Sequence, residues 1–448
     1  FVIVNAGTGA PRDAAEWVRW ANLKMGYKVR YWEVGNEQGG SWEAGHFLPG
    51  GSELNGDIFA RRYEEFARAM KAVDPTIKVG CMDWLEDVLR HCGDLVDFIS
   101  IHSYPVGVSP TMGSETDEEV FSKIDLVRKD MENTRALIHR YQPAREKEVE
   151  VNYSEWSMGW PDIRGAQWHA AWVGEMFRWG VDFALQWHTF GLVDGDNPPV
   201  RTNLYWAFWL WSHTMGDILL SSKTEGADHL ITYATRSKDG LSIMAINTSA
   251  EEEAALDVKI LGFSPSTEGR EIRFTQREYL WVDRAPDLPA WKKGPQTVWN
   301  TGPAVGRFDG SGTFSAAIPP ASIVVFMIPE EGRKPVLEPT SPPRAGKAKL
   351  RIHAPKDFYA GDTAEFLVYA QNGAGAAPYP GPLLQGTITV KGAAKADRET
   401  VRLTEAAGRF TLKSEGPGRA TIVVSSGEAK AVHKMTFITF PRFHNSFS

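Results

Sequence analysis

The sequence has few cysteines and no long apolar run. Only Cys81 and Cys92 occur among its 448 residues, which is too few for a disulfide framework, so we expect both to be free thiols. No stretch approaches the roughly 20 apolar residues that a membrane-spanning helix needs, and the N-terminus shows no signal-peptide pattern. The composition therefore excludes a disulfide-rich scaffold and a protein built of membrane-spanning helices.

The chain also lacks a surplus of positive charge. Its 49 Lys and Arg residues stand against 56 Asp and Glu residues, which gives a formal net charge of -7. Proteins that bind nucleic acid neutralise phosphates with basic side chains, and polybasic membrane anchors use the same attraction. We expect neither a nucleic acid nor a membrane as a partner.

Signals for a cofactor or a metal ion are weak as well. The run Gly7-Thr8-Gly9-Ala10 is too short for a phosphate-binding loop. The loop Asp194-Gly195-Asp196-Asn197 has residue types that suit calcium but lacks the frame and the terminal Glu of an EF-hand. We expect no cofactor and no metal site.

Tryptophan, in contrast, is abundant. The chain has 17 Trp beside 12 Tyr and 22 Phe, and most of the tryptophans precede residue 212. Core packing accounts for most of them. Because an indole face also stacks on the C–H face of a sugar ring, we expect the following ones to contact a sugar substrate: Trp42, Trp84, Trp156 and Trp187.

Residues 1–216 alternate between strand-like and helix-like patterns, which is typical of βα units and a parallel sheet. Phe59, Tyr63, Phe66 and Met70 fall on one face of a predicted helix. Apolar runs predict six strands, at 1–7, 30–37, 78–82, 98–104, 148–157 and 183–189.

Polar and aromatic residues gather where these strands end, which is the end that carries the chemistry in a (β/α)8 TIM barrel. The pairs are Asn36 and Glu37, Asp83 and Trp84, His102 and Tyr104, Glu155 and Trp156, and Trp187 and His188. A doubly wound sheet would carry a Gly-rich phosphate loop instead. We therefore expect an α/β fold with strands three to eight of a barrel. The first two βα units are expected to be cut off or to lie on a second polypeptide or fragment.

The pattern changes after residue 216 to short alternating runs separated by turns. Residues 217–330 predict an antiparallel β-sandwich, and 331–346 a stiff Pro-rich linker. Several further short strands over 347–441 predict an immunoglobulin-like β domain.

Two carboxyl groups follow predicted barrel strands. Tyr31-Trp32-Glu33-Val34-Gly35-Asn36-Glu37 is an apolar strand that ends in an amide and a carboxyl, and Val151-Asn152-Tyr153-Ser154-Glu155 delivers a second carboxyl three strands later. Cleavage of a glycosidic bond with retention needs two such groups about 5 Å apart. Aromatic neighbours should lower the local dielectric and keep Glu37 protonated near neutral pH, as a proton donor requires. We interpret the nearby Glu33 as structural.

These motifs resemble the clan A glycoside hydrolases. Asn5-Ala6-Gly7-Thr8-Gly9, the Ala-Ala-Glu-Trp-Val helix at 14–18 and the Gly35-Asn36-Glu37 strand end are most similar to family 51, the arabinofuranosidases and some endoglucanases. The resemblance covers roughly residues 1–330. It does not extend to the C-terminal module, and the clan's strand-two arginine has no counterpart in this chain.

The resemblance implies a role for each matching residue. Glu37 corresponds to the acid/base, Glu155 to the nucleophile and Asn36 to the partner of the sugar's 2-hydroxyl. His102 and Tyr104 correspond to a pair that borders the site and hydrogen-bonds the nucleophile, and Trp187 to an aromatic at the end of strand eight.

The sequence thus predicts a retaining glycosidase that cleaves plant or microbial polysaccharide, of arabinofuranosidase type. An endo-β-1,4-glucanase or xylanase is an alternative, favoured by the many tryptophans. A non-catalytic carbohydrate-binding protein is an alternative of another class, favoured by the missing strands. Export from the cell is expected from the substrate class alone.

Overall fold

A computed structural model describes residues 1–106, 116–187, 192–194, 200–283, 296–310, 312–341, 346–355, 358–373 and 377–439. The chain divides into two compact units. The first contains residues from 1–108, 122–158 and 172–189, and the second contains residues from 109–121, 159–171 and 190–448.

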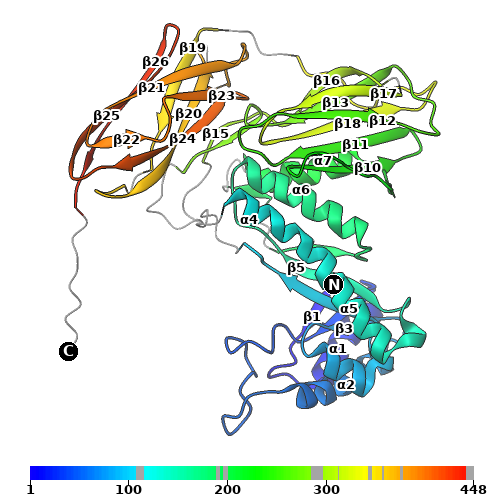
Figure 1. The fold of residues 1–448 in the computed structure, drawn as a ribbon. Helices are drawn as coiled ribbons and strands as arrows, with labels where there is room; N and C mark the ends of the chain where they lie inside the picture. Colours follow the sequence, from blue (N-terminus) through cyan, green and yellow to red (C-terminus); the bar gives the residue numbers. More distant parts are fainter. Residues whose placement is uncertain are drawn as a thin grey trace, which may run out of the picture. The chain divides into compact units, whose positions relative to one another are not determined.

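The first unit is built around a six-stranded parallel sheet whose strands follow chain order. Figure 1 labels three of them, β1, β3 and β5. All five neighbouring pairs are parallel. This sheet and its helices form a partial TIM barrel, and the six predicted strands are confirmed. The strands are β1 (Val2–Val4), β2 (Tyr31–Val34), β3 (Lys78–Cys81), β4 (Phe98–Ser103), β5 (Glu150–Trp156) and β6 (Ala184–Gln186).

Helices connect these strands, as βα units require. The longest of them, α2, forms as its sequence predicts. The side chain of Asn55 caps its first turn by accepting a hydrogen bond from the amide of Ile58, and its predicted apolar face is buried. Within the described residues, no helix is long and apolar enough to cross a bilayer. The helices between these strands are α1 (Pro11–Val18), α2 (Gly56–Val73), α3 (Leu85–Cys92), α4 (Asp117–Ser122), α5 (Leu126–Tyr141) and α6 (Ile163–Arg178), and α7 (Asn203–Thr214) follows the last strand of the sheet in the chain.

The second unit is rich in antiparallel strands. A six-stranded sheet has the order β16-β13-β18-β11-β10-β9, and β12 pairs with β17. Leu230, Ala254, Ile318 and Phe326 belong to one apolar cluster of these strands. The strands are β9 (Ile218–Leu220), β10 (Leu230–Arg236), β11 (Gly240–Asn247), β12 (Ala254–Lys259), β13 (Glu268–Phe274), β16 (Ala304–Asp309), β17 (Thr313–Ile318) and β18 (Ser322–Pro329). Two short antiparallel pairs also belong to it: β7 (Val193–Asp194) with β8 (Val200–Arg201), and β14 (Tyr279–Trp281) with β15 (Thr297–Asn300).

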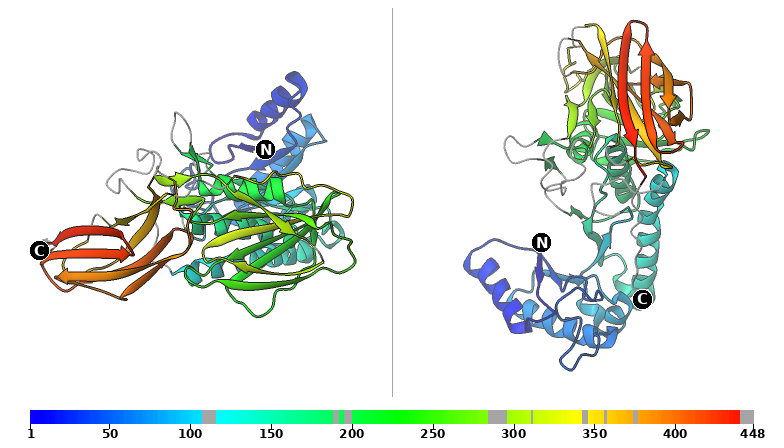
Figure 2. Two further views of the ribbon diagram at one scale, coloured as in Figure 1. Left: turned by 90° about the horizontal axis from the view of Figure 1, so that it is seen from above. Right: turned by 90° about the vertical axis from the view of Figure 1, so that its left-hand side faces the viewer.

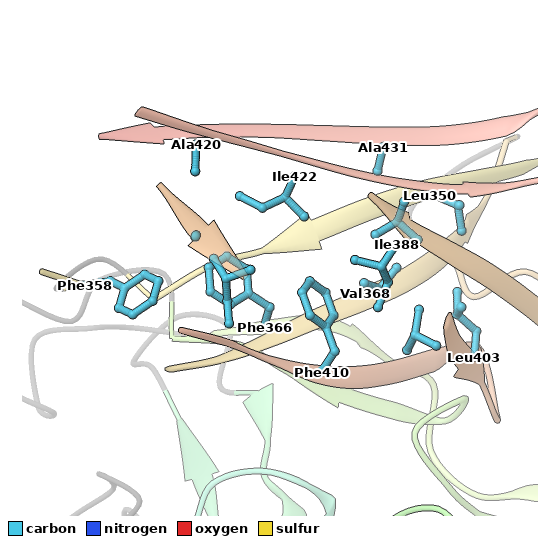
Figure 3. Packing of buried hydrophobic residues seen from close by; sticks show 14 of the residues in the cluster. Leu350, Phe358, Phe366, Val368, Ile388, Leu403, Phe410, Ala420, Ile422 and Ala431 are labelled. Carbon is cyan, nitrogen blue, oxygen red and sulfur yellow. The ribbon is translucent and has the colours of Figure 1, made fainter. Parts of the chain in front are cut away.

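Two four-stranded antiparallel sheets follow, with orders β19-β20-β24-β22 and β23-β21-β25-β26. Figure 3 shows Ile422 and Ala431 of one sheet pointing toward Phe366 and Phe410 of the other, and all four belong to one buried cluster. The long strands β25 and β26 run side by side (Figure 2). The strands are β19 (Ala348–His353), β20 (Thr363–Asn372), β21 (Leu384–Gly392), β22 (Ala394–Ala396), β23 (Thr400–Leu403), β24 (Ala407–Ser414), β25 (Gly418–Ser426) and β26 (Ala429–Phe437). The prediction of β domains after the barrel is confirmed at this level.

The two cysteines are buried free thiols, as predicted. Burial raises the pKa of the Cys92 thiol to about 12, so it stays protonated and unreactive at neutral pH.

Candidate active site

The structure brings Glu37 and Glu155 together at the C-terminal ends of β2 and β5. One donor atom from each of Glu37, His102 and Glu155 lies within 4.8 Å of the other two. All three side chains belong to the first unit, and none is fully exposed. The two carboxyl groups that the sequence analysis singled out therefore lie close together, and their catalytic role stays a prediction.

The backbone at the end of β2 turns sharply. Gly35 has φ +81° and Glu37 has φ +47°, both in the left-handed region. Glycine adopts this region freely, whereas a residue with a Cβ pays roughly 1–2 kcal/mol for it. A strained non-glycine residue of this kind persists only where its surroundings hold it, which is common at functional sites.

Glu155 is placed by an irregularity in the sheet. The β4–β5 pairing shifts register after Ile101, so that Ile101 opposes Tyr153 and His102 opposes Glu155. Ser154 is the extra residue. Such a bulge re-aims the side chains that follow it, and here it puts Glu155 beside His102.

Glu37 accepts two hydrogen bonds. His102 Nδ1 lies 2.8 Å from its Oε1, and Trp42 Nε1 donates to its Oε2 at 3.0 Å. Partial burial raises the pKa of Glu37, but the hydrogen bonds from His102 and Trp42 outweigh it, so its pKa lies below the usual value. The prediction that aromatic neighbours keep Glu37 protonated is therefore wrong for the free protein.

Glu155 lies between His102 and Tyr104. The Tyr104 hydroxyl donates to Glu155 Oε2, and His102 Nδ1 lies 3.5 Å from the same oxygen. Desolvation and the bond to Glu155 both raise the pKa of Tyr104 well above its usual value, so the phenol stays a neutral donor. His102 thus faces both carboxylates through one nitrogen.

Glu33 lies within β2, and Asn36 follows two residues after its end. Asn36 is half-buried, and its Nδ2 donates to Glu43 Oε1 at 3.3 Å. Glu33 is fully buried, and Ser100 Oγ donates to its Oε2. Desolvation raises the pKa of Glu33 to about 8, although the hydrogen bond from Ser100 opposes the rise.

The predicted aromatic contacts separate into exposed and buried residues. Trp42 is 74% exposed, and Trp187 is 39% exposed with its ring 5.9 Å from that of Tyr104. Trp84 is half-buried beside Phe59, at 5.2 Å between ring centroids. Of these three side chains, Trp42 and Trp187 are therefore the ones exposed to solvent.

The structure corrects the prediction that Trp156 contacts a sugar substrate. Only 1% of it is exposed, so its ring is part of the core and does not contact substrate. Consecutive strand residues point to opposite faces, and Glu155 occupies the face of β5 that looks into the site.

Sequence reasoning missed the role of Met82 and Asp83, which follow β3. Asp83 is buried and accepts backbone N–H groups from the turn after Glu37. Its position at a strand end was the signal that could have found it. His188 and the residues 195–199 of the calcium-like loop lie outside the described residues.

Hydrogen bonds account for the cluster without an ion. Two carboxylates and an imidazole are also a ligand set for a divalent metal. However, Trp42 and Tyr104 donate to Glu37 and Glu155, and the imidazole bridges the pair. The residues fit a pair of catalytic carboxyl groups better than a metal centre.

Comparison with known proteins agrees with the motifs. The chain is 26% identical over 204 residues to a probable α-L-arabinofuranosidase C of Aspergillus clavatus, covering 37% of each protein. It is 33% identical over 130 residues to an intracellular exo-α-(1→5)-L-arabinofuranosidase of Acetivibrio thermocellus, covering 23% of this chain and 24% of that protein. No protein-family model matches the chain. The matches thus span well under half the length of these curated relatives.

Solved structures show the same fold. The α-L-arabinofuranosidase of Thermotoga maritima superimposes with a TM-score of 0.59 at 20% identity, covering 73% of this chain and 75% of that one. A family 44 xyloglucanase of Paenibacillus polymyxa has a TM-score of 0.55 at 14% identity, covering 70% of each chain. The chain therefore resembles the clan A glycoside hydrolases and is most like family 51.

Proposed function

We propose that the chain acts as a retaining glycoside hydrolase on plant polysaccharide, of the α-L-arabinofuranosidase type. The observation that carries the proposal is the approach of Glu37 and Glu155 to within 4.8 Å at one end of a parallel sheet. Retaining enzymes hold their two carboxyl groups about 5–5.5 Å apart, whereas inverting enzymes hold them about 6.5–9.5 Å apart.

In the proposed first step Glu155 attacks the anomeric carbon while Glu37 protonates the departing oxygen. The sugar is then bound covalently to Glu155. In the second step Glu37 takes a proton from water, which attacks the anomeric carbon and releases the sugar with Glu155 restored. Asn36 holds the 2-hydroxyl, and Trp42, Trp84 and Trp187 provide the aromatic surface around the sugar.

His102 serves both steps. Its Nδ1 is 2.8 Å from Glu37 and 3.5 Å from Glu155. While Glu37 carries the catalytic proton, the imidazole N–H donates to the ionised nucleophile. After the proton leaves, the N–H returns to the Glu37 carboxylate. This exchange reconciles a proton donor with the low pKa of Glu37 in the free protein.

The curated relatives are named as arabinofuranosidases, which favours an arabinofuranoside substrate. An endo-glucanase or xylanase is the second candidate, because a family 44 xyloglucanase shares the fold and Trp42 is largely exposed. Hydrolysis of an aryl α-L-arabinofuranoside, compared with soluble β-glucan and xylan, separates the two.

The decisive experiment follows the anomer that is released first, by proton NMR, together with Glu37→Gln and Glu155→Gln. We expect retention, and we expect each folded variant to lose at least about 100-fold in turnover, the lower end of what acid–base catalysis contributes. EDTA should not change the wild-type rate. A first product of inverted configuration, or wild-type turnover in either variant, would refute the proposal. Saccharide binding without any hydrolysis would favour a non-catalytic carbohydrate-binding protein.

We propose the domain boundaries on the same footing: barrel over 1–216, β-sandwich over 217–330, linker over 331–346 and immunoglobulin-like domain over 347–441. The buried cluster shared by the last two four-stranded sheets supports the assignment of the immunoglobulin-like domain.

Export from the cell is proposed from the substrate class. Two relatives are named as intracellular enzymes, so fractionation of the producing cell is the test.

A further inference from the structure

We propose that Asp83 is a positioning residue for Glu37 and acts through the backbone of the turn that Glu37 begins. The inference rests on the proposed role of Glu37 as the acid/base. Asp83 itself touches no reacting atom in this scheme. Its task is to fix where the Glu37 carboxyl points.

Asp83 accepts hydrogen bonds from two backbone N–H groups of this turn. Its Oδ2 accepts the N–H of Gln38 at 2.9 Å, and its Oδ1 accepts the N–H of Gly39 at 3.1 Å. The side chain is buried at the C-terminal end of β3, next to the strand that carries Glu37. A buried carboxylate that accepts backbone N–H groups with both oxygens makes charge-assisted bonds, which are stronger than neutral ones.

The residue before Asp83 extends the contact. The N–H of Glu37 points to Met82 Sδ at 3.4 Å. The side chains of Met82 and Asp83 therefore accept hydrogen bonds from three successive backbone N–H groups, those of Glu37, Gln38 and Gly39. The pairing of β2 with β3 runs only as far as Glu33 and Gly80, so these side chains continue the connection past the end of the ladder.

The turn needs such support because of its conformation. Glu37 has φ +47°, which is unfavourable for a residue with a Cβ. With these amides unbound, the turn would relax toward a more favourable φ and carry the carboxyl away from His102. Asparagine at position 83 would offer one amide oxygen in place of two carboxylate oxygens, and its NH2 group cannot accept the second N–H.

The test compares substrates that differ in their need for an acid. An aryl glycoside with a strongly acidic phenol leaves without protonation, whereas a glycoside with a sugar or alkyl leaving group requires it. We expect Asp83→Asn to lower kcat/KM for the second substrate roughly 10- to 100-fold, since misplacement of a catalytic group costs rates of this order. Glycosylation of the enzyme by the activated substrate, followed as the pre-steady-state burst, should stay within about threefold of wild type.

Asp97 offers a matched control. It also accepts a backbone N–H from β3, that of Val79 at 2.8 Å, but near the other end of the strand. Asp97→Asn should change both substrates by the same factor. Equal losses on both substrates in Asp83→Asn, or no loss on either, would overturn the proposal.

Glu37→Gln serves as the reference. If this variant does not discriminate between the leaving groups, the proposed acid role fails; if it does and Asp83→Asn does not, only the role of Asp83 fails. Folding of each variant is checked by circular dichroism and thermal unfolding. Should Asp83→Asn not fold, Met82→Leu removes one of the three acceptors, and it must show a smaller loss confined to the poor leaving group.

Discussion

Trp42 Nε1 donates a hydrogen bond of 3.0 Å to Glu37 Oε2, although most of the Trp42 side chain is in contact with solvent. This bond favours the ionised carboxylate and helps to lower the pKa of Glu37. Trp42→Phe keeps an aromatic ring and removes the donor, so the pKa of Glu37 should rise. Because the acid must be protonated to act, the alkaline limb of the kcat/KM profile should move to higher pH.

The control for this change is Trp17→Phe on α1, another exposed tryptophan outside the contacts of the cluster. Its profile should match that of wild type. An unshifted or acid-shifted alkaline limb in Trp42→Phe would show that the indole does not set the protonation of Glu37.

Tyr104→Phe removes the hydroxyl that donates to Glu155 Oε2. A hydrogen bond to a charged group contributes about 1.5–3 kcal/mol, which corresponds to a loss of roughly 10- to 150-fold in kcat/KM if the bond orients the nucleophile. Tyr27→Phe, an exposed tyrosine on the same unit, is the control. Steady-state kinetics within twofold of wild type would assign Tyr104 a packing role only.

The sequence was enough to find the strands and the two carboxyl groups. Each strand is a short apolar run. Glu37 lies three residues after β2 and Glu155 lies near the end of β5, so the parallel order puts both at one end of the sheet. The approach of the two groups also depends on the bulge at His102 and Glu155. No residue type in the sequence predicts that bulge.

Two predictions failed for reasons that only the three-dimensional structure shows. Trp156 was expected beside the sugar because it follows Glu155, yet strand alternation turns it to the other face, where it is buried. The pKa of Glu37 was expected to rise from its aromatic surroundings, but the nearest tryptophan acts as a hydrogen-bond donor and not as an apolar wall. The proposed role of Asp83 depends on its contacts with backbone amides. Nearly every residue has such an amide, so the sequence gives no signal for these contacts.

Glu33 should make stability depend on pH. Its pKa is near 4.5 in the unfolded chain and rises to about 8 in the fold, mainly through desolvation. The folded protein therefore holds a proton that the unfolded chain releases between these values. The contribution of Glu33 is fully favourable below about pH 4.5 and is lost as pH rises through about 8.

Glu33→Gln keeps the shape of the protonated side chain and cannot ionise. At roughly 1.4 kcal/mol per pKa unit, its gain in unfolding free energy over wild type should grow to the order of a few kcal/mol between pH 5 and pH 9. Thermal unfolding midpoints across this range measure it. Glu16→Gln, at an exposed position, should give a constant difference. A pH-independent difference for Glu33→Gln would mean that Glu33 is ionised in the folded protein.

Trp187→Ala tests whether the exposed aromatic at the end of β6 binds the sugar. Trp187 packs edge-on against Tyr104, whose hydroxyl donates to Glu155, so its ring borders the proposed nucleophile. Loss of one stacking face should weaken binding by about 1–2 kcal/mol of apolar contact, and KM should rise roughly 5- to 30-fold with a smaller change in kcat. Trp187→Phe should recover most of the affinity, because it restores an apolar face without the indole N–H. If kcat falls and KM does not change, Trp187 acts by holding Tyr104 in place.

The same pair of variants also tests the substrate class. An equal rise in KM for a single-sugar aryl arabinofuranoside and for a polymer indicates a contact at the sugar that is cleaved. A rise confined to the polymer indicates an extended cleft.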